Sequence, residues 1–344
     1  MTTIKEIAQL TGVSIGTVDR ALHNRGRVSE ETRNKILKAA DKAGYKANIY
    51  ARNLKRGKAY NFCVIMPDKK NDSRYWELPL KGIIKAAAEM AHYKINVEFF
   101  FYNKYDAKNI VSNFGEAFKN KWDGCIVVPS GDKLFAGLIR QLPSEIPFLY
   151  FDSLVPGTDY LSYIGQDSYK SGAAAAKLMH LLAGSEGEIA VLKFTPEDYH
   201  IMQRTKGFCD HLNNYAEMEV PVIEISPDYI RNTEKQIDGL IKMKGNKLKG
   251  IFVSNASTYL AARYLEKRNL AGKIALIGYD LIKENVDYLK KGTINFIISQ
   301  MSERQGYEAL KTLVDSVILK QKTDKTKFMQ IDIITKENVD YYQS

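Results

Sequence analysis

Residues 3–22, TIKEIAQLTGVSIGTVDRAL, specify two short helices joined by a tight turn. Thr3 and Glu6 have the Thr-x-x-Glu spacing of a capping box, in which each side chain satisfies a backbone N–H at the start of a helix. Gly12 can end this helix because glycine adopts a left-handed backbone conformation without steric strain. Ser14 can cap the second helix. A helix, a glycine-containing turn and a second helix make the helix-turn-helix pattern.

A third amphipathic helix is predicted at residues 30–43. Ser29 can cap its start, and Gly44 can end it. Three short helices around one small core predict an all-α helix-turn-helix headpiece over residues 1–46. The apolar residues expected to form this core recur at helical spacing and are Ile4, Ile7, Ala8, Leu10, Val18, Ala21, Leu22, Ile36, Leu37, Ala40 and Ala43.

The excess positive charge lies in the N-terminal part of the chain. Residues 1–58 hold 13 Lys or Arg against five Asp or Glu, whereas the remaining residues hold 37 against 35. A basic segment on a nearly neutral body is the electrostatic footprint of a module that binds a polyanion. A solvated basic face is the alternative explanation of the same count.

The headpiece resembles the DNA-binding signature of the LacI/GalR repressors. The residues that carry the resemblance are 3–14 and 17–22, followed by GRVSEETR at 26–33 and AGYKAN at 43–48. The similarity extends over essentially all of residues 3–58. It implies that the start of the second helix enters the major groove, where each base pair presents a distinct pattern of donors and acceptors.

The resemblance also implies individual DNA contacts. Ile15, Gly16 and Arg20 occupy the positions that read bases in similar repressors, and Arg20 can discriminate a guanine by ~1–3 kcal/mol through two hydrogen bonds. Thr17 is expected to contact a phosphate. Asp19 stands where serine is usual in the family, and it could accept from a cytosine amino group or orient Arg20. The full set of expected contacts is Thr3, Ser14, Ile15, Gly16, Thr17, Asp19, Arg20, Asn24, Arg27, Tyr45, Asn48, Ala51 and Leu54.

Residues 47–59 match the hinge helix of the family. The segment is short and basic, so it cannot bury enough apolar surface to be a stable helix alone. The resemblance implies that it folds when two copies meet on DNA, with Leu54 wedged into the minor groove. Ala51 is small, as close packing of paired hinges requires. An ordinary interdomain linker is the alternative.

From residue 60 onward, apolar strand-like segments alternate with helical segments. This alternation predicts an α/β domain with parallel sheets covered by helices on both faces, and its length predicts two lobes. We expect one lobe at 60–158 and 293–321 and the other at 159–292 and 322–344. The predicted strands are 62–66, 97–102, 124–128, 148–151, 189–192, 222–225, 250–253 and 275–277, with helices such as 78–91, 171–182 and 258–268.

Polar residues follow four of these strands, at the sheet edge where open α/β sheets bind ligands. They are Asp68, Asp152, Asn255 and Asp280. The region resembles the periplasmic-binding-protein fold that the repressors share with sugar transport receptors, on landmarks at 164–172, 203–208, 277–280 and 298–300. The resemblance implies a cleft for a sugar or sugar-like polyol, in which aromatic rings cover C–H surface and polar groups bind hydroxyls. A core position is the alternative for Trp76. The expected ligand contacts are Tyr75, Trp76, Asp152, Arg204, Asn255, Asp280 and Gln300, with Gln166 a weaker candidate.

The sequence gives little support for an enzyme, a metal or cofactor site, or a transport receptor. The chain has no GxGxxG, GxxxxGK[ST] or HExxH motif, and its five His are scattered, so we expect no enzyme activity, cofactor or metal. Cys63, Cys125 and Cys209 have no CxxC spacing and are expected to be buried reduced thiols. With no signal peptide and no membrane span expected, the protein is predicted to be cytoplasmic and associated with the nucleoid. A transport-type sugar receptor without a DNA role is the alternative, which the headpiece disfavours.

These expectations combine into a ligand-responsive transcription regulator, most simply a repressor. We expect a homodimer that binds a palindromic operator, with half-sites about one helical turn apart. Ligand would close the lobes and change how the hinges meet, coupling the two sites by ~1–3 kcal/mol. Whether ligand releases or promotes DNA binding stays open. Residues 340–344 carry no heptad repeat, so a tetramerising coiled coil is not expected.

Overall fold

The computed structural model describes residues 3–22, 26–43, 58–71, 74–196, 198–225 and 229–342. The chain divides into two compact units, residues 1–58 and 59–344. The predicted hinge lies almost entirely outside the described residues.

The first unit contains the three predicted helices, α1 (Ile4–Thr11), α2 (Ile15–Leu22) and α3 (Glu30–Lys42). The capping box is present, because the Thr3 N–H donates to the Glu6 carboxylate at 2.9 Å and the Glu6 N–H donates to the Thr3 hydroxyl at 3.2 Å. Gly12 ends α1 in the left-handed conformation, with φ 67°. The buried core of this unit consists of Ile7, Ala8, Val18, Ala21, Ile36 and Ala40.

Two leucines that we expected in this core are exposed. Leu10 is 67% exposed and Leu37 is 45% exposed. Their neighbours Thr11 and Ile36 point inward instead, with exposures of 2% and 0%. One residue along an α-helix is a rotation of about 100°, so the inward position of one neighbour turns the other away from the core.

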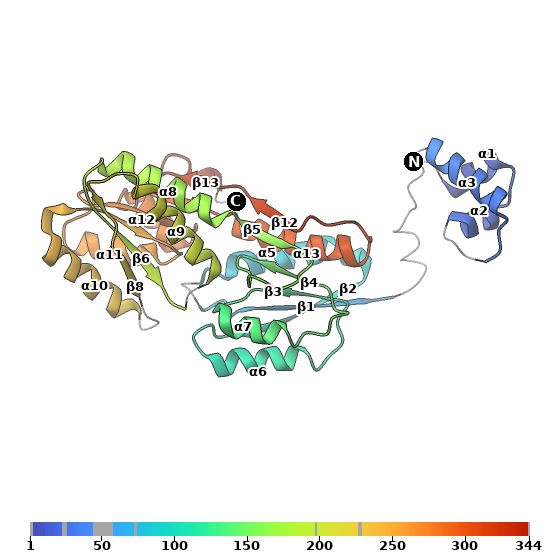
Figure 1. Ribbon diagram of the computed structural model, residues 1–344, viewed down its shortest axis with the longest axis horizontal. Coiled ribbons are helices and arrows are strands. Elements are labelled where there is room, and N and C mark those ends of the chain that lie inside the picture. Colours follow the sequence, from blue (N-terminus) through green and yellow to red (C-terminus); the bar gives the residue numbers. More distant parts are fainter. Residues whose placement is uncertain are drawn as a thin grey trace. The chain divides into compact units, whose positions relative to one another are not determined.

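The second unit has two lobes (Figure 1). The sheet of the first lobe is entirely parallel and has the strand order β12-β5-β4-β3-β1-β2. Helices α5 (Glu77–Glu89) and α13 (Ser302–Val317) cover one face, and α6 (Ala107–Ala117) and α7 (Asp132–Ile139) cover the other. The strands are β1 (Tyr60–Pro67), β2 (Ile95–Tyr102), β3 (Gly124–Val127), β4 (Phe148–Phe151), β5 (Tyr163–Gln166) and β12 (Thr326–Met329).

The sheet of the second lobe has the order β13-β11-β10-β9-β6-β7, with β8 also paired to β6. Its strands are β6 (Gly187–Phe194), β7 (Met218–Glu219), β8 (Val222–Ile225), β9 (Leu248–Val253), β10 (Ala275–Tyr279), β11 (Phe296–Ser299) and the antiparallel β13 (Asp332–Ile334). Helices α8 (Ser168–Ala183) and α9 (Tyr199–Leu212) pack on one face. The other face is covered by α10 (Tyr229–Lys244), α11 (Thr258–Lys267) and α12 (Lys283–Lys291).

All eight predicted strands are present, but the expected lobe boundaries are wrong. Strands β5 and β12 belong to the first lobe and β11 to the second, so the chain crosses between lobes near residues 166, 300 and 330. The apolar texture of a strand does not reveal which sheet it joins. Gln166 lies at the first crossing, and its amide donates to the carbonyls of Ser299 at 3.1 Å and Gln330 at 2.8 Å, tying the three crossings together.

Two of the three cysteines are buried as expected. Cys63 and Cys125 are paired neighbours on β1 and β3, whereas Cys209 on α9 is only partly buried. Among the described helices, none is long and apolar enough to cross a membrane.

Candidate functional site

The first candidate site is the exposed N-terminal turn of α2. The Ser14 hydroxyl caps this helix by accepting the Thr17 N–H at 3.1 Å. Ile15 is 53% exposed, and Gly16 is exposed beside it. The guanidinium of Arg20 folds back over the same turn, donating to the Gly16 carbonyl at 3.2 Å and to the Thr17 hydroxyl at 3.3 Å. A helix N-terminus with an adjacent arginine suits a negatively charged groove.

The remaining expected DNA contacts divide into two groups. Arg27 is exposed, Thr3 serves as the cap of α1, and Asp19 lies half-buried on α2. The others lie outside the described residues, and these are Asn24, Tyr45, Asn48, Ala51 and Leu54.

A sequence motif at this site has the residue spacing of a catalytic serine motif but not its strand–turn–helix geometry. Residues 12–16, GVSIG, have the GxSxG pattern of a nucleophile elbow, which places serine on a turn between a strand and a helix. Here Ser14 lies between two helices, and its hydroxyl is engaged with Thr17 as a helix cap. The serine therefore has a structural role.

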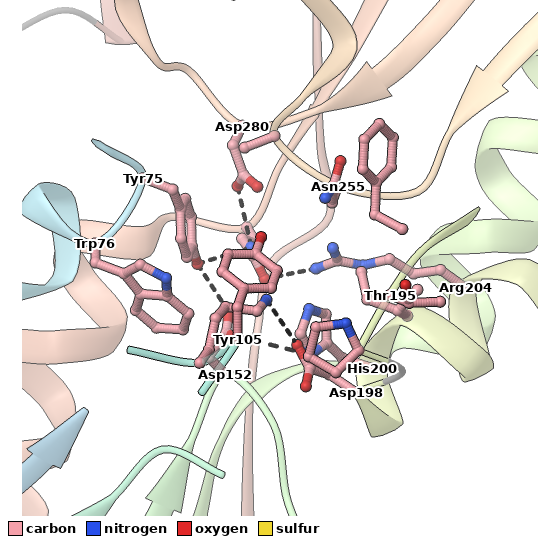
Figure 2. Close-up of a pocket in the computed structure, with 16 residues that line it drawn as sticks. Tyr75, Trp76, Tyr105, Asp152, Thr195, Asp198, His200, Arg204, Asn255 and Asp280 are labelled. Atoms are coloured by element: carbon pink, nitrogen blue, oxygen red, sulfur yellow. Dashed lines mark hydrogen bonds and ion pairs between the residues drawn. The ribbon is translucent and has the colours of Figure 1, made fainter. Parts of the chain in front are cut away.

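The second candidate site is a cleft between the lobes of the second unit (Figure 2). Its residues follow the carboxyl ends of strands in both sheets, which is where open α/β sheets bind ligands. The cleft contains a cavity of about 30 Å³, which is room for one or two waters, because its own side chains fill it. The lining includes Tyr75, Trp76, Lys104, Tyr105, Asp152, Thr195, Asp198, His200, Arg204, Asn255, Asp280 and Gln300.

Seven of the eight predicted ligand residues therefore meet in this cleft. Gln166 does not line it, because its side chain is committed to the crossings between the lobes. Asp152 and Asp280 have φ angles of 64° and 69°. A positive φ costs a non-glycine residue roughly 1 kcal/mol, and such strain is concentrated at functional sites. Both carboxylates are thus held in the cleft against a backbone penalty.

A hydrogen-bond network centred on Gln300 joins the two lobes. The Gln300 amide nitrogen donates to the Tyr75 hydroxyl at 2.9 Å and to the Asp280 carboxylate at 3.0 Å. Tyr75 in turn donates to Asp152 at 2.7 Å. The Gln300 amide oxygen accepts from Arg204 at 2.7 Å. Each of these groups is one that we expected to bind ligand, so in this state they bind one another.

Arg204 is the most deeply buried cation of the cleft, with an exposure of 1%. Its guanidinium lies 3.9 Å from the centre of the Tyr279 ring and donates to the Ser254 carbonyl at 3.2 Å. The ring and the carbonyl fix the plane of the guanidinium toward Gln300.

A second set of contacts joins the two lobes at the cleft. Asp198 precedes α9 in the second lobe, and its carboxylate accepts three donors from the first lobe. These are the Lys104 ammonium at 3.2 Å, the Ser130 hydroxyl at 2.8 Å and the Gly131 N–H at 3.1 Å. The Lys104 and Asp198 side chains are only 8% and 4% exposed. This ion pair holds the lobes together through residues other than the predicted ligand contacts.

The electrostatics of the cleft are dominated by burial. Burial raises the pKa of Asp152 to about 6 and that of Asp280 to about 7, although the positive charge of Arg204 lowers both. Burial also lowers the pKa of His200, with Arg204 adding to the effect, so its imidazole is neutral. His200 Nδ1 lies 3.7 Å from Asp152 and makes no hydrogen bond, so the two do not form an ion pair.

Several residues that line the cleft are not among the predicted ligand contacts. Lys104 and Tyr105 come soon after β2, and Asp198 and His200 come soon after β6. Lys104 and Tyr105 could have been predicted, because they follow the carboxyl end of a predicted strand. Strand β6 was expected to end at residue 192 but continues to Phe194. Because its end was placed too early, the polar residues that follow it were not recognised as lying at a strand end.

The sequence and the fold resemble those of known proteins. Residues 62–321 match the periplasmic binding protein domain, and residues 3–48 match the bacterial regulatory proteins of the lacI family. The chain is 29% identical to the NTD biosynthesis operon regulator NtdR of Bacillus subtilis over 62% of each chain. It is 25% identical to the ribose operon repressor of the same species over 95% of this chain and 94% of that one.

Solved structures share the fold. One is a putative LacI transcriptional regulator from Bacteroides fragilis, with a TM-score of 0.78 and 28% identity, covering 83% of this chain and all of that one.

Proposed function

The chain belongs to the lacI family of bacterial regulatory proteins, and from this premise we propose that it binds a palindromic operator as a homodimer and senses a sugar or sugar-like polyol. Members of this family are DNA-binding transcription regulators that respond to a ligand and are not enzymes. The headpiece excludes the alternative of a sugar receptor without a DNA role. The observation that carries the proposal is the convergence of seven predicted ligand residues from both lobes on one cleft.

The chemistry of the cleft supports a polyol ligand. Tyr75 and Trp76 form an aromatic wall, with ring centres 4.9 Å apart and an edge-on arrangement. Aromatic faces cover the C–H surface of a sugar, and carboxylates and amides bind its hydroxyls. A relative over almost the full length is named a ribose operon repressor, which supports sugar sensing in this chain.

The side chains predicted to bind ligand hydrogen-bond one another in the closed cleft, which supports a switch between this closed state and a ligand-bound state. A cavity of about 30 Å³ is too small for a typical small-molecule ligand, so the lobes must separate for entry. Ligand would then replace the bonds among Tyr75, Asp152, Gln300 and Asp280. We propose that this exchange changes how the hinges at 47–59 meet on DNA, coupling the two sites by ~1–3 kcal/mol.

Thermal melting with a panel of sugars, cyclitols and sugar phosphates tests this function. A ligand that binds only the folded state stabilises it, by roughly 2.7 kcal/mol at 100 times its Kd. We expect a selective rise in melting temperature, and a changed affinity of the full-length dimer for an operator selected from random DNA. The absence of any shift across the panel would contradict sugar sensing and leave the DNA-binding role standing.

Substitution of Arg20 by alanine tests the reading of bases by α2. We expect a loss of ~1–3 kcal/mol of discrimination at one base pair of each half-site, because a bidentate contact to guanine is removed. Binding to a library of single-base operator variants measures this. Lys38→Ala removes an exposed charge from α3 as a control and should affect all operator sequences alike. Equal weakening on all sequences for Arg20→Ala would make Arg20 a phosphate contact.

A further inference from the structure

The side chain of Asp198 does not cap the helix that it precedes. Asp198 occupies the N-cap position of α9, where an aspartate normally accepts a backbone N–H of its own helix. Its carboxylate makes no such hydrogen bond and instead accepts from the first lobe. A stabilising local contact is thus given up for contacts between the lobes.

Both oxygens of this carboxylate are bound by groups of the first lobe. Oδ1 accepts from the Ser130 hydroxyl and the Gly131 N–H, and Oδ2 accepts from the Lys104 ammonium. Gly131 is the N-cap residue of α7, so the carboxylate lies at the N-terminal ends of both α7 and α9, where a negative charge is favoured. Lys104, Ser130 and Asp198 are all buried, so water competes little for these contacts.

The lobes are therefore joined by two separate sets of contacts. One set is the network of Gln300, whose members are predicted to bind ligand. The other set joins Asp198 to Lys104, Ser130 and Gly131, and none of these four is a predicted ligand contact. A ligand that replaced the first set would leave the second set in place.

The second set also positions Arg204. Asp198 and Arg204 are carried by the same helix, six residues apart, which is ~9 Å along its axis. Because a helix moves as a rigid element, separation of the lobes at Asp198 would carry the guanidinium away from Asp152 in the first lobe. Closure at Asp198 and the arrangement of the cleft are thus linked through α9.

We propose that Asp198 and its partners Lys104, Ser130 and Gly131 form a latch that keeps the two lobes closed through protein contacts alone. Ligand then enters only when the latch opens, so the fraction of open protein limits how fast it binds. The latch positions α9 and takes no part in recognising the ligand. It does not depend on the sugar assignment, because all of its groups belong to the protein.

The distance between two spin labels measures closure in the full-length protein, without any added ligand. Ser112→Cys on α6 and Lys235→Cys on α10 place one label on each lobe, at exposed positions. Cys209→Ser removes the partly buried thiol, whereas Cys63 and Cys125 are buried from the labelling reagent. Dilution with unlabelled protein restricts the signal to pairs within one chain. For the intact latch we expect one predominant short distance by double electron–electron resonance.

Removal of both charges together measures the net contribution of the ion pair. Lys104→Met combined with Asp198→Asn should raise the ratio of open to closed lobes ~10-fold, which corresponds to about 1.4 kcal/mol. The reason is that hydrogen bonds to charged groups are stronger than those between neutral groups. Each single substitution leaves the other charge buried and unpaired in the closed state, so it should open the lobes further than the combined change does.

An exposed ion pair within the second lobe supplies the matched control. Lys283 and Asp287 lie 2.7 Å apart on α12, with side chains 84% and 53% exposed. Lys283→Met combined with Asp287→Asn makes the same chemical changes without touching the contact between the lobes. The distance distribution of this control should match that of the intact latch, because an exposed pair contributes little.

Two results would overturn the latch. One is a protein with the latch residues intact whose lobes are predominantly open. The other is a combined variant whose lobes stay as closed as those of the intact protein, since the ion pair would then add nothing to closure. Circular dichroism of each variant establishes that the distances come from folded protein. If the combined variant does not fold, lobes that stay closed in both single variants overturn the latch equally.

Discussion

Replacement of Arg204 by methionine should abolish the response of operator binding to ligand and lower the free energy of unfolding by about 3 kcal/mol. Arg204 is 1% exposed and is the cation whose charge lowers the pKa of both Asp152 and Asp280. Methionine fills much of the volume beside Tyr279 but leaves Asp152 and Asp280 without the guanidinium charge that lowers their pKa values. Removing one partner from a buried charge cluster is among the more costly single changes. Urea unfolding and operator binding with and without ligand measure the two effects.

The stability loss of this variant should depend on pH. The two acids have folded-state pKa values of about 6 and about 7, above the ordinary value of 3.8. An acid with a raised folded-state pKa contributes stability that is present below its unfolded pKa and lost as pH rises through its folded pKa. Without Arg204 both values rise further, so the difference from wild type should grow between pH 5 and pH 8. Protonation can neutralise the acids at pH 5, which limits the loss there.

Arg268→Met is the matched control for Arg204→Met. Arg268 also faces a carboxylate, that of Asp238 at 3.4 Å, but its side chain is 47% exposed. An exposed ion pair contributes about 0–1 kcal/mol, so stability and ligand response should stay close to wild type. If Arg204→Met behaved like this control, Arg204 would not be the cation that compensates the cleft.

The parts of the molecule that sequence predicts well are those specified by local signals. The capping box of Thr3 and Glu6 and the left-handed Gly12 define the first helix within a few residues of chain. Asp152, Asn255 and Asp280 were found because each follows an apolar strand, and the ends of parallel strands converge at one edge of a sheet. These rules depend only on neighbours in sequence.

The parts that sequence did not predict depend on distant partners. The ion pair of Lys104 with Asp198 joins two lobes. The sequence around either residue does not indicate that the other lies 3.2 Å away. The assignment of β5, β11 and β12 to a lobe depends on which sheet the strand enters, and apolar composition is the same for both. Gln166 was expected in the cleft, but its position at a crossing gave its amide two carbonyl partners outside the cleft.

The position of Arg204 depends on two glycines, Gly172 and Gly207, at which helices α8 and α9 pack closely. A Cβ atom at Gly172 on α8 would lie 2.1 Å from the backbone oxygen of Arg204 on α9. A Cβ atom at Gly207 on α9 would lie 2.0 Å from the backbone oxygen of Tyr169 on α8. The two helices therefore touch through their backbones, and this contact sets how far the Arg204 guanidinium reaches into the cleft.

Gly172→Ala should lower the free energy of unfolding by ~1–3 kcal/mol and weaken ligand binding, because the new methyl group has to push α9 away from α8. Helix propensity alone gives the opposite sign, since alanine is favoured over glycine within a helix by about 1 kcal/mol. Gly239→Ala provides the control, because Gly239 lies in α10 with nothing within 4 Å of an added Cβ. That variant should be stabilised. If Gly172→Ala were stabilised as well, α8 and α9 could separate without cost, and the placement of Arg204 would have to be attributed to its contacts with Tyr279 and Gln300.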